Sequence, residues 1–193
     1  MTLGKANIMI STFINLFRQK KPLNIVTTAT PSTKRVEDRG EQWALDGLNF
    51  EKFIITRFSR DGNRLLDWRG DKFIPGYGGP ESSGNPDVLF MTRNEKNRFA
   101  IECKFRNNWW HHTKHGDCIE WAREDQIKRY FGYQRRYGIT VYVAIGVGGS
   151  ATNPAELFIG RIEEVKYRIA RKYHLDKNFR MPLPIPEGGL EFS

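Results

Sequence analysis

Every second residue of 98–105 is apolar, and the residues between are charged except for the small Ala100, a pattern typical of a β-strand. Successive side chains of a strand point to opposite faces. The apolar face of this strand would carry Phe99, Ile101, Cys103 and Phe105. Glu102 and Lys104 would share the opposite face. The sequence therefore predicts a core strand that presents an acid and an amine on the same side.

A second strand is expected just before it, over residues 85–91. It opens at Pro86, where the missing backbone N–H costs no ladder hydrogen bond. Residues 92–97 are polar and would form the loop of a hairpin. If the two strands pair, Asp87 comes to lie beside Glu102.

Two neighbouring carboxylates raise each other's pKa, whereas a bound divalent cation keeps both ionised. Mg²⁺ takes oxygen ligands, commonly one or two carboxylates, and leaves its other positions to water and a substrate phosphate. Lys104 would lie about 6 to 7 Å from Glu102 along the strand, within reach of an attacking water. Asp87, Glu102 and Lys104 therefore indicate a phosphodiester hydrolase that uses Mg²⁺ or Mn²⁺, with the two carboxylates as metal ligands.

The pattern Pro86-Asp87 followed by Glu102-x-Lys104 resembles the PD-(D/E)XK nuclease superfamily, the restriction-endonuclease-like fold. The resemblance covers residues 36–147. It implies an α/β domain whose mixed central β-sheet is flanked by helices in the order α-β-β-β-α-β. It also implies metal ligation by the Asp and the Glu, and a lysine that helps to activate water.

Residues 118–137 are expected to form a helix that is acidic at its start, basic at its end and closed by Gly138. Gln126 is the strongly polar member of the apolar stripe of this helix. Together with Tyr130 it resembles the Gln-x-x-x-Tyr motif of some branches of the superfamily, in which the amide positions the substrate or the lysine. A packing role for both side chains is the alternative.

A first helix is expected over residues 34–48, and Glu41 falls within its apolar arc. This arc consists of Ala44, Leu45 and Leu48. The superfamily often carries a glutamate on its first helix that contributes to the metal site through water, and Glu41 matches that position. Glu37 and Asp38 are the alternatives if the helix phase differs by one turn.

The chain has 193 residues and a formal net charge of +9, from 31 basic and 22 acidic side chains. A cationic surface gains free energy by releasing counterions from nucleic acid, so DNA is the expected partner. Residues 1–32 would form a basic arm and linker, residues 33–175 the nuclease-like domain and residues 176–193 a proline-rich tail.

The apolar run at residues 8–17 is too short to cross a bilayer, so stable membrane insertion is not expected. An amphipathic helix docked on the body or on a second subunit is the main interpretation, with membrane-surface association as the alternative. Only two cysteines are present, which favours a reducing cytoplasm over a disulfide-bonded protein.

The loop at residues 109–118 holds two tryptophans, three histidines and a cysteine. A structural zinc site usually combines two separated ligand pairs, and this loop offers no second pair. A substrate-facing loop is therefore preferred, because such side chains suit base stacking and phosphate contact. The residues expected to contact nucleic acid are Arg106, Trp109, His111, Lys114 and Tyr130.

Later in the chain, strands are expected at residues 140–147 and 156–162, and a basic helix at residues 162–173. The predicted function is a metal-dependent endonuclease that hydrolyses phosphodiester bonds of DNA, with Glu41 and Gln126 in support of the site. A non-catalytic DNA-binding module of the same fold and a Holliday-junction resolvase are the alternatives. Cutting both strands of a duplex would favour a homodimer.

Overall fold

The computed structural model describes residues 31–69 and 84–181, with side chains from residue 40 onward. The chain divides into two compact units, Met1–Glu37 and Asp38–Ser193. Most of the expected arm, the glycine-rich segment at residues 76–83 and the proline-rich tail lie outside the described residues. The expected domain limits therefore remain predictions.

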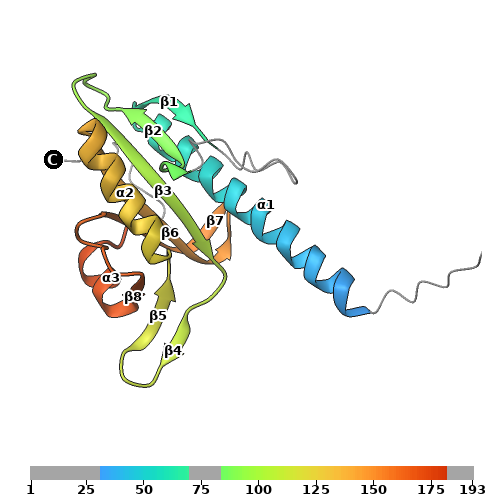
Figure 1. Ribbon diagram of the computed structural model, residues 1–193. Helices are drawn as coiled ribbons and strands as arrows, with labels where there is room; N and C mark the ends of the chain where they lie inside the picture. The colour runs from blue at the N-terminus through green and yellow to red at the C-terminus, as the bar shows by residue number, and fades with distance from the viewer. Residues whose placement is uncertain (1–30, 70–83, 182–193) are drawn as a thin grey trace, which may run out of the picture. The chain divides into compact units, whose positions relative to one another are not determined.

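Three helices and eight strands make up the described part of the chain (Figure 1). In chain order they are α1 (Pro31–Arg60), β1 (Arg64–Trp68), β2 (Val88–Met91), β3 (Arg98–Arg106), β4 (Trp110–His112), β5 (Gly116–Glu120), α2 (Glu124–Tyr137), β6 (Thr140–Ser150), β7 (Asn153–Arg161), β8 (Ile169–Arg171) and α3 (Lys172–Asn178). The order α1-β1-β2-β3-α2-β6 confirms the predicted core, and the β4–β5 hairpin is inserted between β3 and α2.

The central sheet has five strands in the order β1-β2-β3-β6-β7. Strands β3 and β6 run parallel, and the other neighbouring pairs run antiparallel. A parallel pair needs a crossover connection, and α2 belongs to the crossover from β3 to β6. The predicted mixed sheet flanked by helices is confirmed. Strands β4, β5 and β8 form a second, smaller sheet.

The alternation of β3 separates two hydrophobic clusters, one on each face of the central sheet. On one face, Phe99, Ile101 and Cys103 pack with three side chains of α1 spaced four residues apart. Those α1 side chains are Phe50, Ile54 and Phe58. On the other face, Ala100 belongs to a cluster with Ile127, Tyr130 and Tyr133 of α2. Glu102 and Lys104 share the face of Ala100, so the charged pair of β3 points to the side covered by α2 (Figure 1).

Helix α1 extends twelve residues beyond the predicted end at residue 48. Its buried face is the stripe that begins at Phe50, whereas Ala44 is exposed and Leu45 is 49% exposed. The expectation that the earlier apolar arc packs on the core is wrong, because the sheet covers only the later turns of the helix. No helix among the described residues combines the length and apolar character that a membrane span requires.

The helix predicted at residues 118–137 begins only at Glu124, because residues 116–120 pair as β5 with both β4 and β8. The helix predicted at residues 162–173 is also wrong: β8 ends at Arg171, and the helix there, α3, starts at Lys172. Trp121 explains both errors. Its backbone N–H donates to Arg168 O at 3.1 Å and its indole Nε1 donates to Tyr167 O at 2.7 Å, contacts between segments far apart in sequence.

Candidate active site

The β2–β3 hairpin brings Asp87 and Glu102 together. Val88 pairs with Ile101 across the antiparallel ladder, so Asp87, one residue before Val88, lies opposite Glu102. Asp87 Oδ2 accepts a hydrogen bond from the backbone N–H of Cys103 at 2.8 Å. Lys104 Nζ forms an ion pair with Glu102 Oε1. Asp87, Glu102 and Lys104 therefore meet at one place on the sheet, as the sequence motif requires.

Glu102 is 1% exposed, which makes it the one fully buried polar or charged residue in the described part of the chain. Its Oε1 pairs with Lys104, but its Oε2 is buried without a hydrogen-bond partner. An unsatisfied buried polar atom costs about 1 to 3 kcal/mol, and a charged one costs more. A carboxylate oxygen held at such cost near a second carboxylate suits the coordination of a cation.

Burial raises the pKa of Asp87 well above its ordinary value, and the negative charge of Glu102 raises it further. Lys104 opposes this shift through its positive charge. For Lys104 itself, burial alone would lower the pKa, but the charges of Glu102 and Asp87 outweigh burial and the pKa is raised. The three side chains therefore share one electrostatic environment of low solvent access.

Glu51 of α1 is a fourth charged residue near this site, and the sequence prediction missed it. Its charge contributes to raising the pKa of Asp87 and of the Cys103 thiol. Glu51 Oε2 accepts a hydrogen bond from Trp68 Nε1 at 2.7 Å, which attaches the carboxylate to β1. Glu41, the predicted helix glutamate, is exposed on α1 ten residues earlier, about 15 Å along the helix axis.

A signal for Glu51 was present in the sequence. It directly follows Phe50, the first member of an aromatic and aliphatic repeat at four-residue spacing that continues through Ile54 and Phe58. An acid beside such a stripe lies at the border of the buried face. The helix predicted from the sequence ends at residue 48, before this border.

The donor set fits Mg²⁺ or Mn²⁺. Asp87 and Glu102 supply hard carboxylate oxygens, and Glu102 Oε2 has no protein partner. Among residues 40–69 and 84–181, no group of three or more His, Cys, Asp and Glu side chains is close enough to hold a metal ion. Mg²⁺ commonly binds through only one or two carboxylates, with waters and substrate phosphates in its other positions.

Arg69 holds the backbone around Asp87. Its Nη1 donates to Pro86 O at 2.6 Å, and its backbone N–H donates to Asp87 O at 2.8 Å. The guanidinium also pairs with Asp67 at 3.0 Å and lies over the ring of Tyr133, 5.7 Å from its centroid. These contacts connect β1, the start of β2 and α2 around one metal-ligand candidate.

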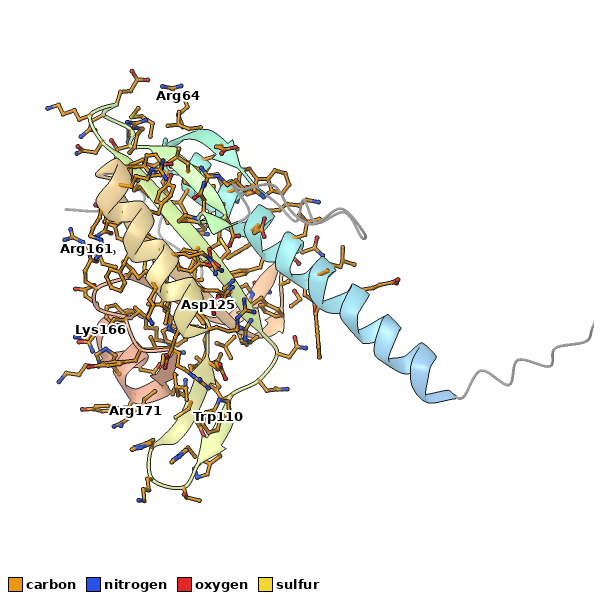
Figure 2. All side chains as sticks on the ribbon, in the orientation of Figure 1. Arg64, Trp110, Asp125, Arg161, Lys166 and Arg171 are labelled. Atoms are coloured by element: carbon orange, nitrogen blue, oxygen red, sulfur yellow. The ribbon has the colours of Figure 1, made fainter. Side chains whose placement is uncertain are left out.

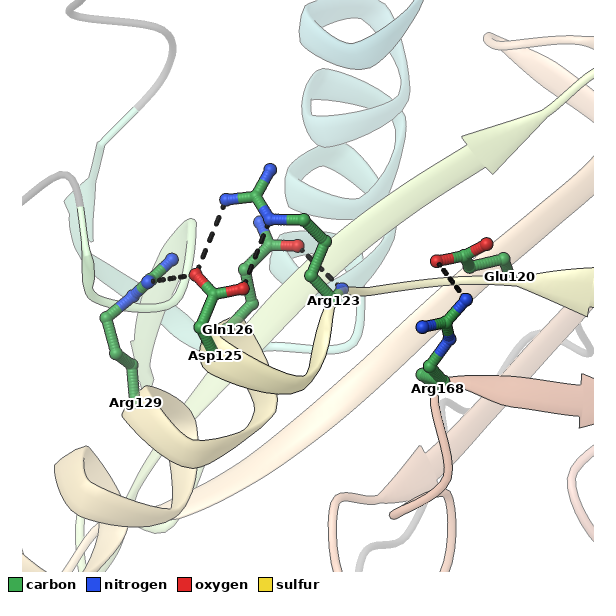
Figure 3. A network of polar contacts seen from close by, with 6 residues as sticks. All are labelled: Glu120, Arg123, Asp125, Gln126, Arg129 and Arg168. Carbon is green, nitrogen blue, oxygen red and sulfur yellow. Dashed lines mark hydrogen bonds and ion pairs between the residues drawn. The ribbon is translucent and has the colours of Figure 1, made fainter.

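Tyr130 and Gln126 have different surroundings on α2. Tyr130 is buried, and burial, then the charge of Glu102 and a hydrogen bond to Glu102, raise the pKa of its hydroxyl. Tyr130 thus forms part of the wall next to Glu102 and is not exposed to a large substrate. Gln126 Oε1 accepts a hydrogen bond from the backbone N–H of Arg123 at 3.0 Å, so this oxygen caps the start of α2 (Figure 3).

Arg123 and Arg129 enclose Asp125 on the exposed side of the same helix (Figure 3). Their nitrogens lie 3.1 Å and 2.7 Å from its carboxylate oxygens. The hydrogen bonds from Arg123 and then Arg129 lower the pKa of Asp125 to about 2. Asp125 therefore stays ionised and neutralises part of the positive charge at the start of α2.

Two of the residues expected to contact nucleic acid have partners within the protein. Arg106 donates to Glu120 O at 3.1 Å and to Trp121 O at 3.4 Å. Trp109 is half-buried, and its indole Nε1 donates to Glu156 Oε2 at 2.6 Å. Both side chains attach the ends of the β4–β5 segment to the central sheet.

Of the remaining three, Tyr130 is buried on α2, and His111 and Lys114 lie on the β4–β5 hairpin. His111 Nδ1 is 3.1 Å from Asp117 Oδ1 on the facing strand, and both side chains are exposed. Lys114 is exposed in the turn between the two strands. Cys118 is buried near the base of the hairpin, and both it and Cys103 are free thiols.

No protein-family model matches this chain, and no curated protein matches it. Among solved structures, it is similar to Hjc from Archaeoglobus fulgidus, described as a Holliday junction resolvase from an archaeal hyperthermophile. The match covers 66% of this chain and 90% of Hjc, with 14% sequence identity and a TM-score of 0.47. Similarity at this level says nothing about the chemistry of Asp87, Glu102 and Lys104.

Proposed function

We propose that this chain is a metal-dependent deoxyribonuclease of the PD-(D/E)XK type, which hydrolyses phosphodiester bonds of DNA with Mg²⁺ or Mn²⁺. One observation carries the proposal: Asp87, Glu102 and Lys104 converge on the β2–β3 hairpin, and Glu102 presents a buried oxygen without a protein partner. The net charge of +9 supports a phosphate-rich substrate.

Asp87 and Glu102 would hold the cation. When bound, such a cation polarises the scissile phosphate and lowers the pKa of a coordinated water. Lys104 would place its ammonium group beside the phosphate and offset the negative charge that develops during attack. Its ion pair with Glu102 fixes the side chain before substrate arrives, so no reorganisation is needed.

Glu51 would take the supporting role that the sequence assigned to Glu41. Its charge acts on Asp87, and its bond to Trp68 fixes one of its oxygens. Gln126 would support the site indirectly, by fixing the start of the helix that carries Tyr130.

A non-catalytic DNA-binding module is the competing function. Two carboxylates at the place where a phosphate must approach would repel it, unless a cation lies between them. A protein that only bound DNA would gain from apolar or basic residues at these positions. The arrangement of Asp87 with Glu102 therefore favours the enzyme.

The experiment that tests the proposal is nicking of supercoiled plasmid by the full chain in Mg²⁺, Mn²⁺ or chelator. The enzyme predicts nicking that requires a divalent cation and is lost in Asp87→Asn. Salt-sensitive binding without cleavage in either cation would instead identify the binding module. A four-way junction run beside linear duplex in the same assay tests the resolvase alternative, because a resolvase prefers the junction.

A further inference from the structure

The β4–β5 hairpin is a short, well-defined structure that the proposed chemistry does not use. His112 pairs with Gly116 across a three-residue turn, and the backbone N–H of His115 donates to His112 O at 3.1 Å. Gly116 closes the turn with a φ of 67°, in the left-handed region where glycine is favoured. The backbone of the turn and of the strand before it therefore has a defined conformation.

Three aromatic rings form a row along this hairpin. Trp110 and His112 are two residues apart on β4, so both lie on one face of the small sheet. Their rings meet edge to face with centroids 5.7 Å apart. His112 then stacks on His115 at 4.6 Å with an interplanar angle of 21°. The Lys114 backbone N–H donates to His112 Nδ1 at 3.2 Å and fixes the central ring.

The row begins with an exposed tryptophan. Trp109 is anchored by its bond to Glu156 and by an edge-to-face contact with Phe158 at 5.8 Å. Trp110, the next residue, points the other way and is 40% exposed (Figure 2). The sequence prediction selected Trp109 for base contact, but the structure exposes Trp110.

Positive side chains flank the aromatic row. Lys114 lies in the turn, and Arg171 of β8 pairs with Cys118, which in turn pairs with Trp110, so Arg171 shares the face of Trp110 (Figure 2). Neither Lys114 nor Arg171 has an ion-pair partner among the described residues. Glu120 pairs with Arg168 at 3.4 Å (Figure 3), and Asp117 Oδ1 lies 3.1 Å from His111 Nδ1 on the facing strand.

The hairpin is attached to the end of the strand that carries the candidate active site. Arg106, the last residue of β3, donates to the carbonyls of Glu120 and Trp121 at the end of β5. Trp110 is six positions after Lys104, a span of at most about 20 Å. About six base pairs of duplex cover that length at 3.4 Å per step.

We infer that the face of the hairpin formed by Trp110, His112 and His115 is a stacking platform for unpaired bases of DNA, with Lys114 and Arg171 contacting the neighbouring phosphates. Base stacking on aromatic rings beside a cationic track is how proteins bind single strands with little sequence preference. The inference rests on the proposed function and deepens it: the substrate is DNA with a single-stranded segment within a few nucleotides of the scissile bond.

The test measures binding without cleavage. Full-length Asp87→Asn protein in chelator is titrated into a fluorescein-labelled oligo-dT, a duplex of equal length, and an oligonucleotide of equal length whose sugars carry no bases. The platform predicts tighter binding to oligo-dT than to the abasic strand, because only the former can stack. Equal affinity for these two strands, or no measurable binding to oligo-dT, would overturn the inference.

Trp110→Ala in the same background is predicted to weaken oligo-dT binding about tenfold and to leave abasic-strand binding unchanged. Trp110→Phe keeps an aromatic face and is predicted to restore most of the affinity. The matched control is Trp43→Ala, which removes a 66% exposed tryptophan from α1. An equal loss in Trp110→Ala and Trp43→Ala would contradict the platform.

The outcome is separable from that of the nuclease proposal. If the protein nicks DNA with a divalent cation but Trp110→Ala does not change oligo-dT binding, the nuclease proposal stands and the platform is refuted. If Trp110→Ala weakens oligo-dT binding but the protein never cleaves, the platform stands and the nuclease proposal is refuted.

Discussion

Asp87 Oδ2 accepts a hydrogen bond from the backbone N–H of Cys103 at 2.8 Å, so one metal-ligand candidate is attached to the strand that carries the other. Cys103 lies between Glu102 and Lys104, which places this bond at the centre of the motif. The relative position of the two carboxylates is therefore set by the β2–β3 ladder and this bond together. A site built on paired strands is held more firmly than one built on loops.

Lys104→Met is predicted to reduce the rate of plasmid nicking at saturating DNA by roughly 100-fold or more, because it removes the positive charge next to the phosphate. Removing one partner of a buried ion pair also costs about 3 to 5 kcal/mol of stability. Circular dichroism therefore gives the folded fraction first, and rates are compared per folded molecule. Lys128→Met, on the exposed side of α2, is the control. Equal rates in the two variants would remove Lys104 from the mechanism.

Glu51→Gln and Glu41→Gln decide which glutamate of α1 supports the site. We predict that Glu51→Gln lowers the nicking rate at least tenfold at saturating metal, because the proposal gives this carboxylate the supporting role at the metal site. The amide keeps the side-chain size and one oxygen for Trp68. If Glu41→Gln lowers the nicking rate more than Glu51→Gln does, the assignment from the sequence is right and Glu51 has only a structural role.

Gly146→Ala is predicted to destabilise the fold by about 1 to 3 kcal/mol, because overpacking a dense core forces side chains and backbone to shift. Gly146 lies on β6 opposite the ring of Phe50, which leaves no room for a Cβ. Gly132→Ala in α2 is the matched control, as nothing lies within 4 Å of its added Cβ. It is predicted to stabilise by about 0.5 to 1 kcal/mol through helix propensity. Urea unfolding measures both, and a neutral Gly146→Ala would refute the packing of α1 on β6.

Glu156→Gln is predicted to lower stability by about 1 kcal/mol at pH 7, because Glu156 accepts from Trp109 and pairs with Lys172 and with Arg180 at 3.2 Å. Burial opposes ionisation of this carboxyl, but the hydrogen bonds from Lys172 and Trp109 outweigh burial, so the pKa lies below its ordinary value of 4.5.

The pH dependence follows from the direction of that shift. A carboxyl with a depressed pKa in the folded state adds stability above its unfolded pKa and loses it as pH falls through the folded pKa. The difference between wild type and Glu156→Gln should thus hold from pH 7 to about pH 5 and shrink below about pH 4. If the difference in unfolding free energy between wild type and Glu156→Gln stays constant down to pH 3 in urea titrations, the ion-pair network is contradicted.

The local parts of this architecture were predictable from sequence. Alternation in residues 98–105 correctly separated the face of β3 that packs on α1 from the face of Glu102 and Lys104. The polar loop at residues 92–97 correctly predicted the hairpin, and that pairing alone places Asp87 opposite Glu102. These features depend on neighbours fewer than twenty residues apart in sequence.

The features that were missed depend on contacts between distant segments. Residues 118–120 have an apolar spacing that suits a helix, but β8, fifty residues later, pairs with them as a strand. The extent of α1 beyond residue 48 is set by packing of Phe50, Ile54 and Phe58 on the central sheet. The repeat beside Glu51 is visible in the sequence, but only the packing of this part of α1 on the sheet brings Glu51 near Asp87.

Diffraction from crystals soaked in Mn²⁺, recorded at a wavelength where manganese scatters anomalously, tests the central claim most directly. The account predicts an anomalous peak bound by Asp87 and by Glu102 Oε2, and loss of that peak in Glu102→Gln crystals. An Mn²⁺ peak elsewhere in the molecule, with Asp87 and Glu102 left without a cation at saturating metal, would contradict the proposed nuclease site.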